Sequence, residues 1–166
     1  MKSVSTGREL LNLLDLANVQ FYEVSAKLDA GFQTGLAAAI GGEAGESQDL
    51  SSPEGSAGED ADADAQVWTF FIHVDDTKVN FRGRLAVDAP DARYVIDAAV
   101  FYVAKEEVSI DRDALQEFLN RAAMIALYPF VREALHEAGR KIGANPPLLG
   151  IYDPQKIQIQ LSEPVG

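Results

Sequence analysis

Residues 111–151 read DRDALQEFLNRAAMIALYPFVREALHEAGRKIGANPPLLGI and form the longest periodic segment of the chain. Apolar residues recur three and four positions apart with charged residues between them, which predicts one long helix with a single buried stripe. A helix from about residue 114 to residue 142 is roughly 45 Å long at 1.5 Å per residue, so the rest of the chain must pack against it. The stripe comprises Leu115, Phe118, Leu119, Ala122, Ile125, Ala126, Phe130, Val131, Leu135, Ala138 and Ile142.

The ends of this helix are also marked in the sequence. Asp111 or Asp113 can accept hydrogen bonds from the free amides of the first turn. Gly143 supplies a left-handed stop, and two prolines soon after it prevent continuation. Pro129 removes one backbone hydrogen bond inside the helix, so a bend is expected at residues 125–128.

Length, charge and cysteine content limit the class of protein. The chain has 166 residues, a net charge of −12 and no cysteine. The length suits one domain with a substantial core. The absence of cysteine excludes disulfides, thiolate metal sites and a cysteine nucleophile, and the acidic charge disfavours a nucleic acid or an anionic membrane as partner. No apolar run has the form of a signal peptide or a membrane span, so we expect a cytoplasmic protein.

An acidic segment at residues 41–65 contains no lysine or arginine and almost no large apolar residue. Such a segment buries too little surface to offset the entropy of ordering it. We therefore expect one domain over residues 1–166 with a disordered loop at 41–65. The spacing of Asp60, Asp62 and Asp64 is similar to the start of a calcium loop, but the glycine and glutamate required downstream are missing. No metal site is predicted there.

The N-terminal part predicts a short helix followed by a strand. Ser5 or Thr6 with Glu9 has the spacing of a capping box, and the leucines that follow predict an amphipathic helix ending near Ala17. Residues 19–30 then alternate in the manner of a half-buried strand. The apolar face of that strand is predicted to hold Tyr22, Val24, Ala26 and Leu28.

Three further strands are predicted between the acidic segment and the long helix, at residues 66–74, 78–87 and 93–106. The third is apolar on both faces, which is typical of a central strand. The C-terminal KIQIQL, residues 156–161, alternates as an edge strand or an extended tail would. The fold class is therefore α+β: a four-stranded antiparallel sheet with one long kinked helix packed on it and a short N-terminal helix.

No catalytic or nucleotide-binding motif is present, so neither an enzyme nor a cofactor is expected. His73 and His136 lie far apart in the sequence and are interpreted as structural. The stretch at residues 124–131 and both faces of the strands at 66–74 and 93–106 carry more large apolar residues than one helix-on-sheet layer uses. This surplus indicates an oligomer interface, an apolar ligand site, or a wide but ordinary core.

Four features of the long helix resemble SecB and the SecB-like chaperones. They are the aromatic-proline-aromatic step Tyr128-Pro129-Phe130, the pair Arg132-Glu133, Gly143, and the stretch Pro147-Leu148-Leu149. A proline inside a helix costs about 3 kcal/mol, so the first feature is fairly specific. The order of elements agrees over nearly the whole chain, whereas outside the helix the likeness is one of pattern.

The resemblance implies a cytosolic, ATP-independent holdase that assembles as a homotetramer, a dimer of dimers, with the long helices between two sheets. It implies binding of unfolded polypeptides or preproteins in apolar grooves and, in export members, transfer to the ATPase SecA. The residues that correspond to the client-binding groove are Trp68, Phe70, Ile72, Tyr128, Leu148, Leu149, Ile151 and Tyr152.

Asp29 and Asp97 fall near the acids that face SecA in export members, and their alternative interpretation is as solvated charges on the sheet. Ser25 stands where another acid is expected, and the second C-terminal helix of export members is missing. These departures favour a SecB-like chaperone dedicated to one client, such as an antitoxin. A small-ligand-binding α+β domain and a purely structural oligomerisation module remain as alternatives from other classes.

Overall fold

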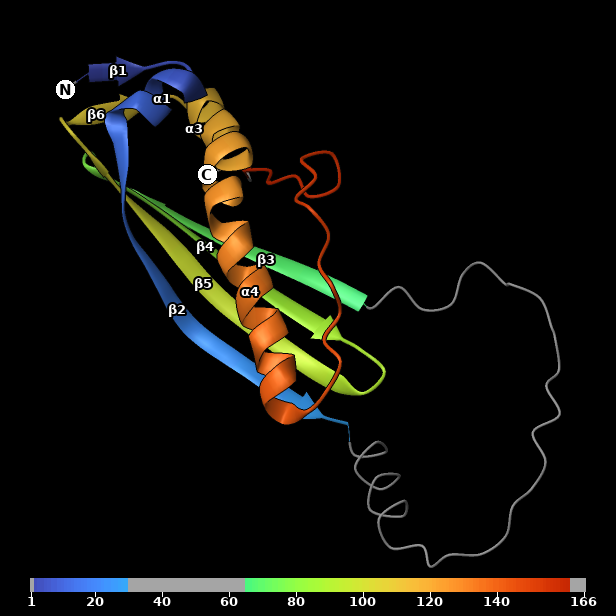
Figure 1. Cartoon of the computed structure of the whole chain (residues 1–166). Helices are drawn as coiled ribbons and strands as arrows, with labels where there is room; N and C mark the ends of the chain where they lie inside the picture. The colour runs from blue at the N-terminus through green and yellow to red at the C-terminus, as the bar shows by residue number, and fades with distance from the viewer. Residues whose placement is uncertain (1, 30–64, 162–166) are drawn as a thin grey trace, which may run out of the picture.

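The computed structural model describes residues 2–29 and 65–161. A four-stranded antiparallel sheet carries one long helical segment across one of its faces (Figure 1). The predicted α+β class is confirmed. In chain order the elements are β1 (Lys2–Val4), α1 (Gly7–Leu13), β2 (Leu14–Leu28), β3 (Ala65–Val74), β4 (Lys78–Asp88), β5 (Ala92–Ala104), β6 (Val108–Ile110), α3 (Arg112–Phe118), η1 (Leu119–Ala123) and α4 (Met124–Ile142).

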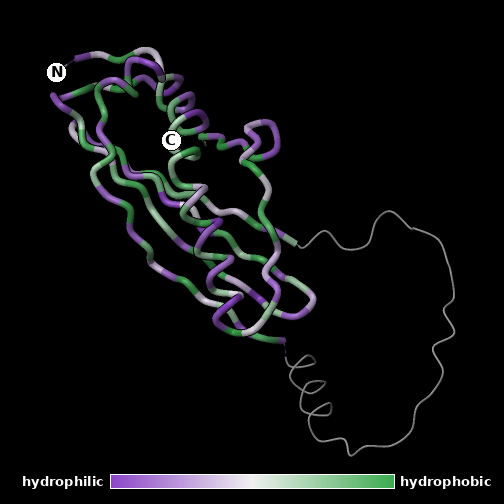
Figure 2. The backbone as a smooth tube through the Cα atoms, viewed as in Figure 1, coloured by the Kyte–Doolittle hydropathy of each residue, from purple (hydrophilic) through white to green (hydrophobic). Residues whose placement is uncertain are grey.

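The strand order is β2-β5-β4-β3, with β5 inside the sheet as its apolar sequence predicts. Directly paired residues of antiparallel strands lie on the same face, so the pairs of Leu85 with Trp68 and with Ile96 place all three beneath the helix. Alternate residues of β4 on that face are buried, whereas those between them are only partly buried. Figure 2 shows hydrophobic stretches along the sheet and alternating hydropathy along α4.

The predicted cap of α1 is confirmed at Thr6, whose Oγ1 accepts from the Glu9 amide at 3.2 Å. The Glu9 carboxylate accepts from the Ser5 amide at 3.4 Å, one residue before the position that a capping box uses. The predicted helix end near Ala17 is wrong, because α1 ends at Leu13 and β2 begins immediately. Long-range pairing with β5 starts at Leu14 and prevails over the local helical preference of the leucines. The short parallel pair β1 and β6 was also not predicted, since three residues are too few to show a period.

An irregularity in β2 corrects the predicted faces of this strand. The pairing with β5 shifts between Phe21 and Glu23, so Tyr22 is an extra residue that points away from the helix. Its ring lies 4.2 Å from the Arg82 guanidinium, while Val24 pairs with Ile96 on the helix side. The prediction that Tyr22 shares a face with Val24 is therefore wrong.

The long helical segment is continuous from Arg112 to Ile142, as predicted, but it contains a π-helical turn, η1. There the Met124 amide donates to the Leu119 carbonyl, five residues back. Within this segment the departure from α-helical bonding therefore precedes the bend predicted at 125–128, and α4 continues through Pro129.

The two ends of the segment differ from each other. Asp111 occupies the N-cap position, but its side chain makes no capping hydrogen bond, so that detail of the prediction is wrong. At the other end Gly143 has φ 74° and stops α4 as predicted. The amides of Gly143 and Ala144 donate to the carbonyls of Arg140 and Gly139, which is the Schellman arrangement.

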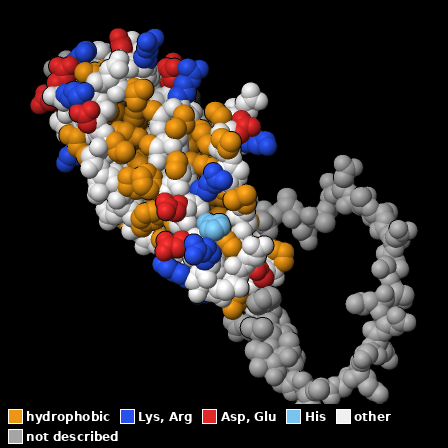
Figure 3. All heavy atoms as spheres, viewed as in Figure 1, with side chains coloured by type: hydrophobic (Ala, Val, Ile, Leu, Met, Phe, Trp, Pro, Cys, Tyr) orange, Lys and Arg blue, Asp and Glu red, His pale blue; other side chains and the backbone are white. Residues whose placement is uncertain are grey.

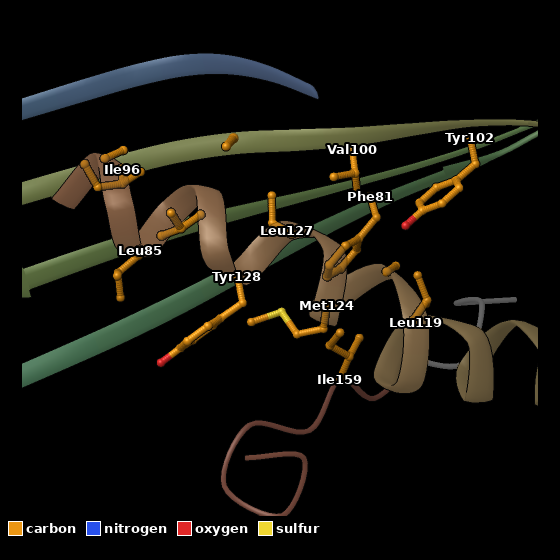
Figure 4. Packing of buried hydrophobic residues seen from close by; sticks show 14 of the residues in the cluster. Phe81, Leu85, Ile96, Val100, Tyr102, Leu119, Met124, Leu127, Tyr128 and Ile159 are labelled. Atoms are coloured by element: carbon orange, nitrogen blue, oxygen red, sulfur yellow. The ribbon is translucent and has the colours of Figure 1, made fainter. Parts of the chain in front are cut away.

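The core lies between the sheet and the helix, where Leu119, Met124 and Leu127 meet the helix-facing residues of β4 and β5 (Figure 4). Two residues of the predicted buried stripe, Ile125 and Phe130, are exposed instead. No helix in the described ranges is both long and apolar enough to cross a membrane. Of the predicted loop at 41–65, only Ala65 is described, as the first residue of β3; the others lie outside the described residues.

Candidate binding cleft

The chain returns along α4 after Gly143, in a segment at residues 144–154 that we call the strap (Figure 1). Gly139 permits this return, because a Cβ there would lie 2.6 Å from Pro146. The strap is fixed at two points by tyrosines. Tyr128 donates its hydroxyl to the Gly150 carbonyl at 3.2 Å, and Tyr152 donates to the Asn120 carbonyl at 3.0 Å.

A cleft of about 1080 Å³ lies between the strap and the outward side of α4, and we call it the strap cleft. Leu149 is buried beneath it, whereas Leu148 and Ile151 are 74% and 89% exposed. Figure 3 shows hydrophobic side chains gathered along α4 and beside it on this face. The lining residues are Ile125, Tyr128, Pro129, Arg132, Glu133, His136, Glu137, Arg140, Lys141, Pro147, Leu148, Leu149, Ile151, Tyr152 and Pro154.

Charge is confined to one end of the strap cleft. The lining residues from Arg132 to Lys141 are charged or histidine, whereas the strap and the α4 turn at Ile125 to Pro129 supply apolar and aromatic groups. Burial raises the pKa of Tyr128 and of Tyr152 above the ordinary value of a phenol. Both hydroxyls are therefore neutral donors near pH 7. A cleft of this kind can hold an apolar segment at one end and a polar or charged one at the other.

The three predicted groove residues of β3 do not line this cleft. Trp68, Phe70 and Ile72 are half-buried on the helix-facing side of the strand. The Trp68 ring stacks on Phe70 with centroids 5.6 Å apart and on Tyr128 at 6.0 Å, and Phe70 stacks on Phe81 at 5.5 Å. We call this set the aromatic stack. Tyr128 is the residue that belongs to both the stack and the cleft.

A glycine that the sequence analysis did not single out allows the aromatic stack to form. A Cβ on Gly83 would lie 2.8 Å from a methyl of Leu127 and 3.4 Å from the rings of Trp68 and Phe70. Leu127 thus reaches the sheet beside the two rings because position 83 has no side chain. A glycine inside a strand pattern is itself the signal for such a close approach.

The two predicted acids lie in different environments. Asp29 is exposed at the end of β2, where its amide donates to the Asp91 carbonyl at 2.9 Å. Asp97 is only 2% exposed and accepts two hydrogen bonds of 2.7 Å from Arg82. These hydrogen bonds raise the pKa of Arg82. The interpretation of Asp97 as a solvated charge is therefore wrong.

Arg82 is held on the outer face of the sheet between two aromatic rings. Its guanidinium carbon lies 4.2 Å from the Tyr22 ring and 5.3 Å from the Phe71 ring. Arg84 adds a second positive charge, 3.8 Å from Asp97. The arginines were visible in the sequence, but their partner became identifiable only from the strand register. His136 lines the strap cleft and His73 lies on β3, and no metal-binding cluster exists among the described side chains.

Comparison with known proteins finds SecB-like chaperones among the similar proteins. No protein-family model matches the chain. The SecB-like chaperone SmegB of Mycolicibacterium smegmatis is 24% identical over 76 residues, a match that covers 46% of this chain and about half, 52%, of the relative.

The same fold is found in the SecB-like chaperone Rv1957 of Mycobacterium tuberculosis, solved in complex with a ChAD peptide from the antitoxin HigA1. The TM-score is 0.59 at 12% identity, and the alignment covers 89% of this chain and 93% of that one. The resemblance that rests on the Tyr128-Pro129-Phe130 helix is thereby supported by two independent comparisons, one of sequence and one of structure. The chain has the SecB-like chaperone fold.

Proposed function

We propose that this protein is an ATP-independent holdase chaperone that binds unfolded or non-native polypeptide segments in the strap cleft. The observation that carries the proposal is the exposure of Leu148 and Ile151 beside a cleft of about 1080 Å³. Exposure of such large apolar side chains to water costs free energy, which a ligand that covers them would recover. The SecB-like fold supports the same conclusion.

The proposal includes assembly as a homotetramer, a dimer of dimers. β2 is an edge strand of the sheet, and three of its helix-side residues, Leu16, Phe21 and Val24, are 47%, 42% and 49% exposed. An exposed apolar strand edge favours pairing with another chain. Light scattering at micromolar concentration tests this: a monomer would contradict the assembly while leaving the cleft unaffected.

Suppression of aggregation tests the holdase activity. A chemically denatured client is diluted into buffer with increasing amounts of this protein and without ATP, and turbidity is followed. We expect the final turbidity to fall as the molar ratio approaches that of one assembly per client. Unchanged turbidity at several-fold excess would refute the proposal.

A second candidate is a chaperone dedicated to one client, for example an antitoxin. It is favoured because the M. tuberculosis structure with this fold contains a peptide of an antitoxin. Transfer to SecA during protein export has less support, since Arg82 covers one of the two acids assigned to that contact, Asp97. Polypeptides recovered with the tagged protein from its own cells discriminate the candidates: one dominant species indicates a dedicated chaperone, and many species indicate a general one.

A further inference from the structure

The last described segment of the chain, residues 157–161, lies extended against α3 and η1 and is held there by side chains that bind its backbone; we call it the tail. The Asn120 side chain accepts from the Ile159 amide at 2.8 Å and donates to the Ile159 carbonyl at 3.0 Å. The Gln116 side chain donates to that same carbonyl and accepts from the Leu161 amide at 2.9 Å. Arg112 donates to the Leu161 carbonyl.

The spacing of these side chains suits an extended chain. Arg112, Gln116 and Asn120 are four residues apart, and four residues of helix rise about 6.0 Å. Two residues of an extended strand rise about 6.6 Å. Gln116 therefore binds both Leu161 and Ile159, with Arg112 on the Leu161 side and Asn120 on the Ile159 side, and the tail runs antiparallel to the helix. We call these three side chains the ladder.

The ladder contacts only backbone groups of the tail, so its hydrogen bonds do not depend on the sequence bound. Side-chain selection comes from one buried position: Ile159 is 4% exposed and points toward Met124 and Leu119 (Figure 4). Gln158 and Gln160 are exposed. The site thus fits a segment in which apolar residues alternate with polar ones, the pattern of a strand taken out of a folded protein.

The π-helical turn lies at this site. η1 begins at Leu119, and Asn120 donates both to the Gln116 carbonyl within the helix and to the tail. Single π-helical turns occur frequently at functional sites. The irregularity therefore coincides with the residues that bind the tail backbone.

The site of the tail adjoins the strap cleft at Pro154, a residue of the strap. Pro154 lines both the strap cleft and the hollow beside the ladder. The centroids of the Tyr152 and Tyr128 rings lie 5.5 Å apart. The Tyr152 hydroxyl donates to the Asn120 carbonyl, and its oxygen lies 3.4 Å from the Ile157 carbonyl oxygen. Removal of the tail would expose the ladder to another extended chain that lies beside the strap cleft.

We infer that Arg112, Gln116 and Asn120 form a backbone-binding site for an extended polypeptide, that residues 157–161 are its resident occupant, and that a client segment with alternating apolar residues replaces them. The inference rests on the proposed holdase function, which it deepens by naming the form of the bound segment. The tail then acts as a competitor that only clients of this form displace.

A spin label on the tail tests the replacement in the full chain. The sequence has no cysteine, so Gln160→Cys gives a single attachment site on an exposed position. The probe client is reduced and carboxymethylated α-lactalbumin, which stays unfolded in native buffer. We expect the label to become mobile as the client saturates the protein. A label that stays immobile while the client binds would overturn the inference and leave the holdase function standing.

Client affinity tests the competition. Ile159→Asp frees the tail without altering the ladder, and Gln158→Asp is the matched control because it adds the same charge at an exposed neighbour. If the tail is docked about 90% of the time, freeing it lowers the client Kd about tenfold. The control should keep the original Kd. Equal Kd values for Ile159→Asp and the unaltered chain, both folded by circular dichroism, would overturn the inference.

Removal of the ladder side chains distinguishes their two roles, which are to hold the tail and to bind the client backbone. Gln116→Ala with Asn120→Ala frees the tail as well, while alanine keeps the helical propensity high. Because the ladder is then lost to the client too, we expect a Kd well above that of Ile159→Asp. An equally tight Kd in both variants would contradict a backbone-binding site. Failure of the unaltered chain to bind any client would refute the holdase function itself.

Discussion

The aromatic stack and the strap cleft meet at Tyr128, yet one is closed and the other open. Trp68 and Phe70 are half-buried and each stacks on two rings, whereas Leu148 and Ile151 touch little and are 74% and 89% exposed. Side chains of similar hydrophobicity are thus used for two purposes. Those of the stack stabilise the contact of sheet and helix, and those of the strap remain available to a ligand.

The largest effect is expected from the closed side. Trp68→Ser with Phe70→Ser removes the stack beneath α4, and we expect the free energy of unfolding to fall by about 4 kcal/mol. Truncation of one fully buried aromatic side chain costs about 3–5 kcal/mol. Each of these two half-buried side chains should cost less than that. Urea denaturation measures it. Val67→Ser with Thr69→Ser, exposed on the other face of the same strand, is the control. A loss equally large in the control would show that the stack has no special weight.

Gly83→Val should weaken the same region less. The new side chain meets Leu127 and crowds the rings of Trp68 and Phe70, so overpacking should cost about 2 kcal/mol. Ala86→Val, between the buried positions of the same strand, should change stability little. Thermal unfolding of both variants checks the difference, and a Gly83→Val protein as stable as the original would mean that α4 moves away from the sheet without cost.

The open side should respond in binding and not in stability. Leu148→Ser with Ile151→Ser removes apolar contact to a client, and we expect a Kd about tenfold higher, equivalent to about 1.4 kcal/mol. Fluorescence titration with a labelled unfolded client measures it, with Leu11→Ser as an exposed apolar control outside the cleft. An unchanged Kd would show that clients bind elsewhere.

Tyr128 allows the connection between the two sides to be measured. Tyr128→Phe keeps the stacked ring but removes the hydrogen bond to the Gly150 carbonyl, which should cost about 1 kcal/mol. Burial raises the pKa of this hydroxyl above its ordinary value of 10.0. Its contribution is therefore fully present below about pH 10 and is lost as the pH rises through the raised pKa.

The pH dependence of stability tests whether this hydroxyl holds the strap. Denaturation curves at pH 7 and above pH 10 should show the unaltered chain losing more stability on alkalinisation than Tyr128→Phe does. Parallel losses in the two proteins would mean that the strap is not held by this hydroxyl.

The sequence predicted the elements with a strong period and missed those that depend on distant partners. The strands at 66–74, 78–87 and 93–106 and the helix stop at Gly143 are confirmed, because alternation and a left-handed glycine are local signals. The end of α1 was wrong because pairing with β5 prevails there. The shift at Tyr22 depends on strand register, which no local pattern reveals.

The candidate site was predictable only in part, because some of its contacts depend on residues that are distant in the sequence. The resemblance in the long helix identified the strap residues, and Tyr128, Leu148 and Ile151 do lie around one cleft. The β3 aromatics lie in a separate stack beside the place where Leu127 packs against Gly83. This contact depends on packing between helix and sheet, which no local sequence pattern reveals. Gln116 and Asn120 look like ordinary surface residues until the tail is seen beside them.

Gly83 has a consequence for other proteins that share this architecture. The missing side chain at Gly83 in β4, one of the two inner strands, sets how near the sheet and the helix approach, and the side chain that fills the space comes from position 127. Positions 83 and 127 should then vary jointly across such proteins, with a bulkier residue at one accompanied by a smaller residue at the other. The distance between the helix and the sheet therefore depends on the residues at these two positions.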